Sequence, residues 1–540
     1  MRESARTQII EYDSACRNKF RKNTLIFAAW SSRHTTSSIL NRLSSMSTQS
    51  TPRFQHFIDG QDTPPASSQY FPTENPYSGA VWAEVARGNA ADVDRAVQAA
   101  HTAFESSAWS DLTATQRGKL MFRLAELIQR DAAKLAEIEM RDNGKLAAEV
   151  TTQVAYVADY FRYYAGLADK VESRVIPTDK KGVTCFTTYE AKGVVAIITP
   201  WNSPLTLTSW KLAPALAAGC TAVIKPSEFT SPSAVMFAKL FKEAGFPDGV
   251  VNVVTGFGGE VGEPLVTHPL VAHVGFTGGE MAGQKIYEAA ARGLKTVTLE
   301  LGGKSPNIVF DDADLDQAVK GVVSGIFAAA GQTCIAGSRL LVQESIHDQF
   351  VARLVEFVAQ AKLGDPTKAD TQIGPIATRP QLEKILAYID IAKAEGAHCA
   401  LGGKQRSDLG AGWFVEPTIF TGVNNRMRIA QEEVFGPVLS VIPFKDEQDA
   451  IAIGNYVAYG LAAGVWTQSL HRAMLMTKRL RAGTVWVNNY RSTSVTTPFG
   501  GYKRSGIGRE SGVEAIKEYL ETKSIWLSSD LEVPNPFVRR

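Results

Sequence analysis

The chain has 540 residues, too many for one hydrophobic core, so we expect about two or three domains. Hydrophobic residues make up 44% of the chain and charged residues 21%, and no apolar run approaches the roughly 18 residues that cross a bilayer, which predicts globular domains. The 57 basic and 55 acidic side chains nearly balance, which argues against nucleic acid or a membrane as a partner.

The N-terminal extension, residues 1–53, differs in composition from the rest. Residues 1–50 carry eight basic and three acidic side chains, whereas the remaining chain carries 49 and 52. A basic, serine-rich start is typical of a mitochondrial transit peptide, although early acids are not. Met46 as the true start and a disordered extension are the two alternatives. We expect a cytoplasmic protein, or a mitochondrial one if residues 1–45 are a transit peptide.

The five cysteines are few, odd in number and widely spaced. This pattern argues against a disulfide framework and favours a reducing compartment. The sequence contains neither a CxxC pair nor an HExxH motif, so we expect no metal site.

Regular patterns begin near residue 90. Apolar residues repeat at helical spacing from Val93 to Phe104 and from Leu120 to Leu135, and Asn143-Gly144 ends the second repeat. Short β-branched runs then alternate with amphipathic stretches. This alternation predicts a doubly wound, Rossmann-like parallel sheet with helices on both faces. The expected strands are 194–198, 222–224, 250–254, 274–276 and 296–299, and the expected helices are 233–244 and 281–291.

A second alternating block begins with a strand at 306–310 and continues through helices at 315–330 and 346–361, which predicts a second α/β domain. Two other segments alternate in the manner of strands. The first, 171–192, resembles a hairpin of 175–176 with 184–189, and the second is 522–527. Each is either an ordinary surface hairpin or an edge that pairs with a neighbouring subunit.

Glycine-rich stretches at 256–262 and 278–283 each follow an expected strand and precede a helix, as a pyrophosphate site requires. Neither matches the dinucleotide fingerprint GxGxxG. The string GGKS at 302–305 resembles the end of a phosphate loop, but Thr298 stands where the first glycine of that loop belongs, which excludes an ATP site.

Cys334 lies among glycines and short polar residues that let the backbone approach a ligand closely. A thiol in such surroundings is a candidate nucleophile. The alternative is a small buried hydrophobic residue.

Seven short motifs, in this order and spacing, resemble the aldehyde dehydrogenase superfamily over about residues 54–528. They are TPWNSP at 199–204, KPSE at 225–228, FTGG at 276–279, ELGGK at 300–304, GQTC at 331–334, EVFGP at 433–437 and PFGG at 498–501. The resemblance implies a homodimer or homotetramer and the following division: an NAD-binding domain at 54–172 and 192–302, a catalytic domain at 303–502, a bridging β-arm for oligomerisation at 173–191 and 518–528, and a tail at 529–540.

The resemblance also implies the chemistry. Cys334 matches a nucleophile that forms a thiohemiacetal and then a thioester with an aldehyde, and Asn202 matches the oxyanion donor that acts with the backbone N–H of Cys334. Glu300 matches the base that activates water for thioester hydrolysis, with a solvated strand-end charge as the alternative. Glu510 matches an acid of a proton relay in some members, and a plain salt bridge is the alternative.

For the cofactor, Lys225 and Glu228 match the pair that holds the adenosine ribose. A carboxylate there repels a 2′-phosphate, so NAD is favoured, while NADP stays possible. Glu433 matches the ligand of the nicotinamide ribose, and Phe435 packs beside it. Gly279 replaces the commoner serine but keeps the helix amides. The other cofactor contacts that the resemblance implies are Ile198, Thr199, Trp201, Gly258, Phe276, Thr277, Gly278 and Leu301.

For the substrate, Trp210 and Phe499 match aromatic residues of the pocket wall. Ser203 stands where many members have an aromatic or apolar residue, and Arg491 lies in an unusually polar loop. We therefore expect a polar, aromatic or carboxylate-bearing aldehyde, whose carboxylate would meet Arg491. The alternative for Arg491 is an ion pair with a neighbouring acid at the surface.

Two other functions remain as alternatives. A CoA-acylating member would transfer the thioester to coenzyme A, but such members usually lack the base at the Glu300 position. A catalytically silent structural relative would not need Cys334, Asn202 and Glu300 together.

Overall fold

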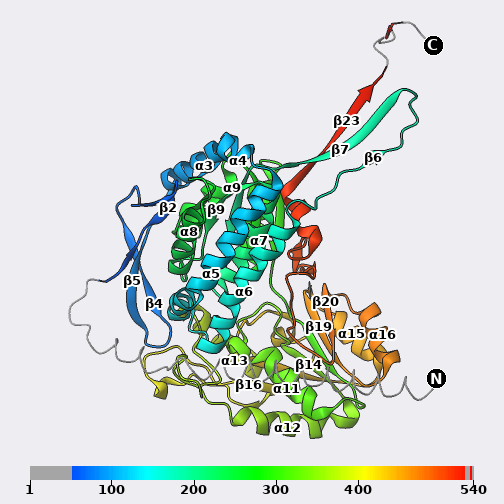
Figure 1. Ribbon diagram of the computed structural model, residues 1–540. Coiled ribbons are helices and arrows are strands. Elements are labelled where there is room, and N and C mark those ends of the chain that lie inside the picture. Colours follow the sequence, from blue (N-terminus) through cyan, green and yellow to red (C-terminus); the bar gives the residue numbers. More distant parts are fainter. Residues whose placement is uncertain (1–50, 530–534, 538–540) are drawn as a thin grey trace, which may run out of the picture. The chain divides into compact units, whose positions relative to one another are not determined.

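The apolar runs between residues 194 and 300 are five neighbouring parallel strands at the centre of an eight-stranded sheet (Figure 1). In this computed structural model, which describes residues 51–529 and 535–537, the predicted parallel sheet is confirmed. Antiparallel edge strands extend it at both sides, which the sequence did not predict. In sheet order the strands are β22 (Gly506–Ile507), β12 (Thr296–Glu300), β11 (Val271–Thr277), β8 (Val194–Ile198), β9 (Thr221–Lys225), β10 (Val251–Val253), β2 (His56–Ile58) and β3 (Gln61–Thr63).

Helices cover both faces of this sheet, as the alternation predicted. Val195 and Ile197 of β8 belong to one apolar core, and Val194 and Ala196 to another, because successive side chains of a strand point to opposite faces. The first core includes α5 (Ala114–Asn143), α6 (Ala147–Leu167), α7 (Pro204–Ala218) and α8 (Pro232–Ala244), and the second includes α3 (Ala90–Glu105), α9 (Glu263–Thr267) and α10 (Glu280–Ala291).

A second sheet of seven strands follows, parallel except for one edge strand, and it confirms the second α/β block. Helices pack on both of its faces as well. The strands in order are β15 (His398–Leu401), β16 (Thr418–Thr421), β17 (Val438–Phe444), β14 (Arg339–Gln343), β13 (Pro306–Val309), β19 (Ala462–Trp466) and β20 (Thr484–Val487). The helices are α11 (Leu315–Ile326), α12 (His347–Ala359), α13 (Arg379–Ala394), α15 (Glu447–Asn455) and α16 (Leu470–Arg479).

The predicted helix 315–330 is wrong at its C-terminal end. Helix α11 ends at Ile326, and the short turn η2 (Ala328–Gly331) follows, in which Ala329 and Ala330 have φ angles of 52° and 51°. A local alanine pattern favours a longer helix. The left-handed conformation is held by tertiary contacts instead, because the amide of Ala329 donates to Glu149 Oε1 at 3.0 Å. The loop that contains Cys334 begins directly after this turn.

The two strand-like segments that the residue pattern left separate, and that the resemblance assigned to one arm, pair with each other. Strand β7 (Val183–Ala191) lies between β6 (Val175–Ile176) and β23 (Leu520–Ser528), antiparallel to both. Figure 1 shows β7 and β23 running away from the helices. Several large apolar side chains on this arm are exposed, among them Val175 at 77% and Trp526 at 58%.

Two small sheets complete the strands: β1 (Arg53–Phe54), β5 (Ala80–Ala86) and β4 (Tyr70–Asn75) form one, and β18 (Tyr459–Gly460) and β21 (Tyr502–Lys503) form the other. The remaining short helices are α4 (Ser107–Ser110), η1 (Gly258–Gly262), η3 (Glu344–Ile346), η4 (Ser407–Leu409), α14 (Arg428–Gln431) and η5 (Val513–Tyr519).

The predictions for residues 1–50, and those for most of the tail, lie outside the described residues. Within the described ranges, no helix combines the length and apolarity of a membrane span. Across the same part of the chain, no three or more His, Cys, Asp or Glu side chains are grouped to hold a metal ion.

Candidate active site

The carboxyl ends of the parallel strands in the first sheet gather most of the predicted cofactor residues. Such ends meet at one edge of a sheet, where ligands of open α/β folds bind. The loops at this edge are tied together: the amide of Thr199 donates to Lys225 O at 3.2 Å, and that of Gly278 to Glu300 O at 3.0 Å. The residues at this edge are Ile198, Thr199 and Trp201 at the end of β8, Lys225 and Glu228 at the end of β9, Gly258 after β10, Phe276, Thr277, Gly278 and Gly279 at the end of β11, and Leu301 after β12.

The N-terminus of α10 is open to an anion. Gly279 caps this helix without a side-chain hydrogen bond, and a Cβ added to Gly279 would meet no atom within 4 Å. Gly258 has the same open surroundings. Unpaired amides and the helix dipole favour a negatively charged ligand such as a pyrophosphate.

Lys225 and Glu228 lie side by side, with 3.5 Å between Nζ and Oε2. The ammonium also donates to Pro226 O at 2.9 Å, and burial lowers the pKa of Lys225. The Glu228 side chain is 29% exposed, so a ligand can reach its carboxylate.

The second sheet contributes Glu433 and Phe435 from the segment before β17. Glu433 Oε1 accepts from the amide of Gly303 at 2.9 Å, and burial raises the pKa of this carboxyl group. The Phe435 ring meets the Trp201 ring edge to face, with 5.3 Å between centroids. The amide of Gly303, in the string GGKS, therefore binds a carboxylate of the protein itself.

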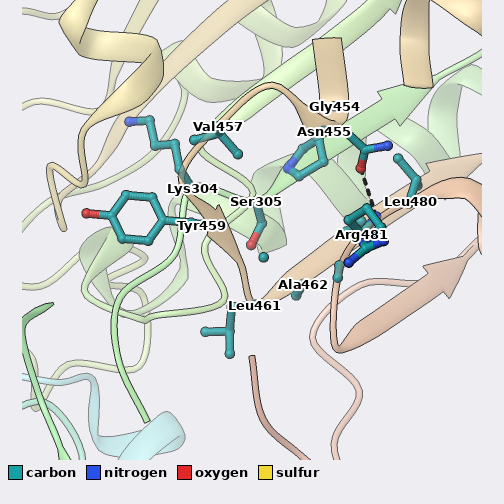
Figure 2. Close-up of a pocket in the computed structure, with 14 residues that line it drawn as sticks. Lys304, Ser305, Gly454, Asn455, Val457, Tyr459, Leu461, Ala462, Leu480 and Arg481 are labelled. Atoms are coloured by element: carbon teal, nitrogen blue, oxygen red, sulfur yellow. Dashed lines mark hydrogen bonds between the residues drawn. The ribbon is translucent and has the colours of Figure 1, made fainter. Parts of the chain in front are cut away.

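Lys304, in the string GGKS, is 2% exposed and does not belong to the residues gathered at the carboxyl edge of the first sheet. It lines a small pocket of its own (Figure 2), and burial lowers its pKa to about 7. On the other side of that pocket, the amide of Arg481 donates to Asn455 Oδ1 at 2.8 Å.

The structure brings Asn202 next to the Cys334 loop. Asn202 Nδ2 donates to the backbone oxygen of Gln332 at 3.0 Å. The Gln332 side chain in turn accepts from the amide of Ala377 at 2.8 Å, which fixes the loop. Among the described residues, Asn202 makes no second side-chain bond through its amide nitrogen, so one N–H is free to meet an oxyanion.

Cys334 is a partly buried residue. Its desolvation by surrounding protein atoms, together with the charges of Glu300 and Glu433, raises the pKa of the thiol to about 12. At neutral pH and without a bound ligand, this cysteine is therefore a protonated thiol.

Glu300, at the end of β12, is only 4% exposed, which rules out a solvated strand-end charge. Neither carboxylate oxygen has a hydrogen-bond partner among the described residues. Burial, and then the charge of Glu510, raise the pKa of Glu300 well above its ordinary value. A buried, unpaired carboxyl group of this kind is a candidate general base once it has lost its proton.

Lys211 and Glu510 form a buried ion pair of 2.7 Å, in which the two side chains are 0% and 2% exposed. Lys211 Nζ also donates to Thr277 Oγ1 at 2.5 Å. The salt bridge expected as one alternative for Glu510 is present, and its charge acts on Glu300. Sequence reasoning missed Lys211, although a single lysine inside the apolar helix α7 was a signal for a buried charge.

The predicted substrate residues divide into an aromatic and a polar group. The rings of Trp210 and Phe499 pack at 4.9 Å between centroids. Ser203 Oγ accepts from Lys145 Nζ at 2.6 Å, a contact that the sequence did not reveal. Arg491 Nη1 donates to Ser324 O at 3.2 Å, and within the described residues no carboxylate lies within 4.0 Å of its guanidinium, so the expected surface ion pair is not found there.

Comparisons with known proteins identify the chain's relatives. Residues 63–525 match the model of the aldehyde dehydrogenase family. The chain is 49% identical over 491 residues to (Z)-2-((N-methylformamido)methylene)-5-hydroxybutyrolactone dehydrogenase of Acinetobacter baylyi, covering 90% of this chain and 100% of that protein. It is 46% identical over 470 residues to an aldehyde dehydrogenase of Emericella nidulans, covering 87% and 94%. A crystal structure of betaine aldehyde dehydrogenase from Staphylococcus aureus in complex with NAD+ matches with a TM-score of 0.89 and 42% identity, covering 93% and 99%.

Proposed function

The chain belongs to the aldehyde dehydrogenase family, and from this premise we propose that it oxidises an aldehyde to a carboxylic acid with NAD, by way of a thioester on Cys334. The surroundings of Cys334 are the observation that supports the proposal. The Asn202 amide is bonded to the Cys334 loop, and the charge of the buried, unpaired Glu300 acts on the thiol.

In the first stage, the Cys334 thiol gives its proton to solvent water, and its sulfur forms a bond to the aldehyde carbon. The carbonyl oxygen becomes an oxyanion, which the free N–H of Asn202 and the backbone N–H of Cys334 stabilise. When the C–H bond breaks, the hydride leaves and the C=O bond re-forms as a thioester. Bound NAD supplies the acceptor for that hydride.

In the second stage, Glu300 takes a proton from water, and the water oxygen attacks the thioester carbon. The C–S bond breaks and Cys334 is regenerated. Overall, an aldehyde, NAD+ and water give a carboxylate, NADH and two protons. The buried Lys211–Glu510 pair lies close enough to influence the Glu300 carboxyl group, so we assign it to proton transfer away from Glu300.

The residues of the first sheet fit NAD. The open N-terminus of α10 suits the pyrophosphate, and the reachable carboxylate of Glu228 suits two ribose hydroxyls but repels the 2′-phosphate of NADP. Relatives of known structure, from Staphylococcus aureus and Bacillus cereus, are described in complex with NAD+. Use of NADP as a second cofactor stays possible in this proposal.

For the substrate, the polar group around Ser203 and Arg491 supports an aldehyde that carries a polar or carboxylate end, while Trp210 and Phe499 supply an aromatic wall. The name of the Acinetobacter baylyi relative points the same way. A 5-hydroxybutyrolactone is the ring-closed tautomer of a 4-oxo acid, which is an aldehyde with a carboxylate.

For the assembly, the exposed apolar side chains of β6 and β23 support a homodimer or homotetramer formed through the arm. An unpartnered apolar strip on a protruding sheet is otherwise costly in water.

The experiment is an NADH-linked panel of aliphatic, aromatic, amino and carboxy aldehydes, with and without coenzyme A. We expect NADH formation with NAD, release of free acid, and no dependence on coenzyme A. Cys334→Ser serves as the blank. Activity that persists in this variant would overturn the mechanism, and an acyl-coenzyme A product would favour the CoA-acylating alternative.

A further inference from the structure

Lys145 is a buried cation without a counter-ion in contact. It lies in the turn between α5 and α6 and is 5% exposed. Its ammonium donates to Ser203 Oγ at 2.6 Å and to Gln153 Oε1 at 2.7 Å. In the described part of the chain, no carboxylate oxygen lies within 4.0 Å of Nζ. Burying a charge in this way is costly unless an anion compensates it.

The charged groups nearest to Lys145 do not supply that anion. Glu139 Oε2 accepts from the amide of Leu205 at 3.2 Å, and Glu149 Oε1 accepts from the amide of Ala329 at 3.0 Å. Burial lowers the pKa of Lys145, both carboxylates raise it from a distance, and the charge of Arg491 lowers it further. The ammonium is thus left with neutral oxygen partners alone.

The Ser203 hydroxyl is consequently oriented as a donor. Its oxygen accepts from Lys145, and no acceptor for its own proton is found among the described residues. A hydroxyl whose oxygen is bonded to an ammonium is a stronger donor than an ordinary serine. Ser203 is partly exposed, so a ligand can reach its hydroxyl, and it directly follows Asn202 in the chain.

We propose that the Ser203 hydroxyl, held and polarised by Lys145, donates a hydrogen bond to the carboxylate of the aldehyde substrate. Ser203 is then a specificity residue, and Lys145 is a positioning residue that acts through it. This inference rests on the proposed function and narrows its substrate class. Asn202 and Ser203 are neighbours in the chain, with Cα atoms about 3.8 Å apart, so we expect the carboxylate to lie only a few bonds from the aldehyde carbon. The pair therefore selects short aldehyde acids.

The test compares 4-oxobutanoate with pentanal, which has an ethyl group in place of the carboxylate. With NAD and the full-length protein, we expect wild type to prefer 4-oxobutanoate in kcat/KM by about tenfold or more. Ser203→Ala and Lys145→Met should each lower that preference by about 10- to 100-fold, as the loss of a hydrogen bond to a charged group predicts. The loss should fall on KM for 4-oxobutanoate rather than on kcat.

Two further variants separate recognition from folding. Ser203→Thr keeps the hydroxyl and should restore most of the preference. Lys119→Met, at an exposed site on α5, should leave both rates unchanged. The inference would be overturned if Ser203→Ala and Lys145→Met left the ratio of kcat/KM for 4-oxobutanoate to kcat/KM for pentanal unchanged, whether both values fell equally or neither fell. An equally large loss on the neutral 4-hydroxybutanal would also overturn it, because Ser203 would then recognise a hydroxyl and not a carboxylate.

Binding provides a readout that does not depend on turnover. Butanedioate carries the same carboxylate but cannot be oxidised at an aldehyde carbon, and calorimetry should show that it binds wild type about tenfold more tightly than Ser203→Ala. If wild type oxidises no aldehyde, the proposed function fails, and the binding difference still decides this inference. Equal binding to both proteins overturns it.

Discussion

Replacing Glu300 by glutamine removes the proposed base with little change in size. Glu300 is 4% exposed, and both of its oxygens lack hydrogen-bond partners among the described residues, so no hydrogen bond from the described part of the chain is lost. A glutamine side chain cannot accept the proton of water. We therefore expect Glu300→Gln to form the thioester and to hydrolyse it slowly.

The size of the expected loss in kcat follows from the role of Glu300 as a general base. A positioned general base contributes about 10²- to 10⁴-fold, which corresponds to about 3–5 kcal/mol of transition-state stabilisation. The pKa of Glu300 is raised well above its ordinary value, which makes the carboxylate a stronger base than an exposed glutamate. We expect kcat to fall by at least about 100-fold.

The assay is rapid mixing with absorbance detection of NADH. Glu300→Gln should give a fast burst of one NADH per active site, followed by slow turnover, and intact-protein mass spectrometry should detect the acyl group on Cys334. Glu126→Gln, at an exposed position of α5, is the matched control and should show wild-type turnover. Slow NADH formation without a burst would refute the reasoning, because Glu300 would then act before the thioester. An unchanged kcat would refute the role of base altogether.

Four other changes test other parts of the structure. Lys211→Met leaves the buried Glu510 carboxylate unpaired and should lower the free energy of unfolding by about 3–5 kcal/mol in a denaturant titration; a wild-type midpoint would contradict a charged pair. Glu228→Ala should lower kcat/KM for NAD about tenfold and raise the NADP-to-NAD ratio, and a constant ratio would exclude a ribose contact. Because the pKa of Cys334 is about 12 and only the thiolate reacts, alkylation of its peptide by iodoacetamide should rise about tenfold per pH unit from about pH 7 to pH 10; a plateau in that range would contradict the raised pKa. Trp526→Glu places a charge on the exposed arm and should reduce the molar mass measured by light scattering, whereas an unchanged mass would exclude this strand from the interface.

Features set by neighbours along the chain were predictable. The strands between residues 194 and 300 follow from short runs of buried β-branched residues, and α5 ends where Asn143-Gly144 predicted, with Gly144 at a φ of 70°. The motifs placed the candidate residues after these strands, and the parallel order of the sheet then brought them to one edge. Periodicity and turn chemistry are local properties, so a single sequence contains them.

Features set by distant partners were not predictable. The alanines after Ile326 favour a helix, but Glu149 fixes a left-handed turn there. The residue patterns left β7 and β23 as two separate segments, because neither pattern contains the register that joins them, and only the family resemblance assigned both to one arm.

The sequence by itself determined the α/β architecture and the residues that match the family's chemistry. Only the tertiary structure decided that Glu300 is buried and unpaired, that Lys211 meets Glu510, and that Lys145 holds the hydroxyl of Ser203. Each of these states depends on burial and on charges from other elements. Desolvation and ion pairing arise only when the chain is packed, so the residue type alone does not encode them.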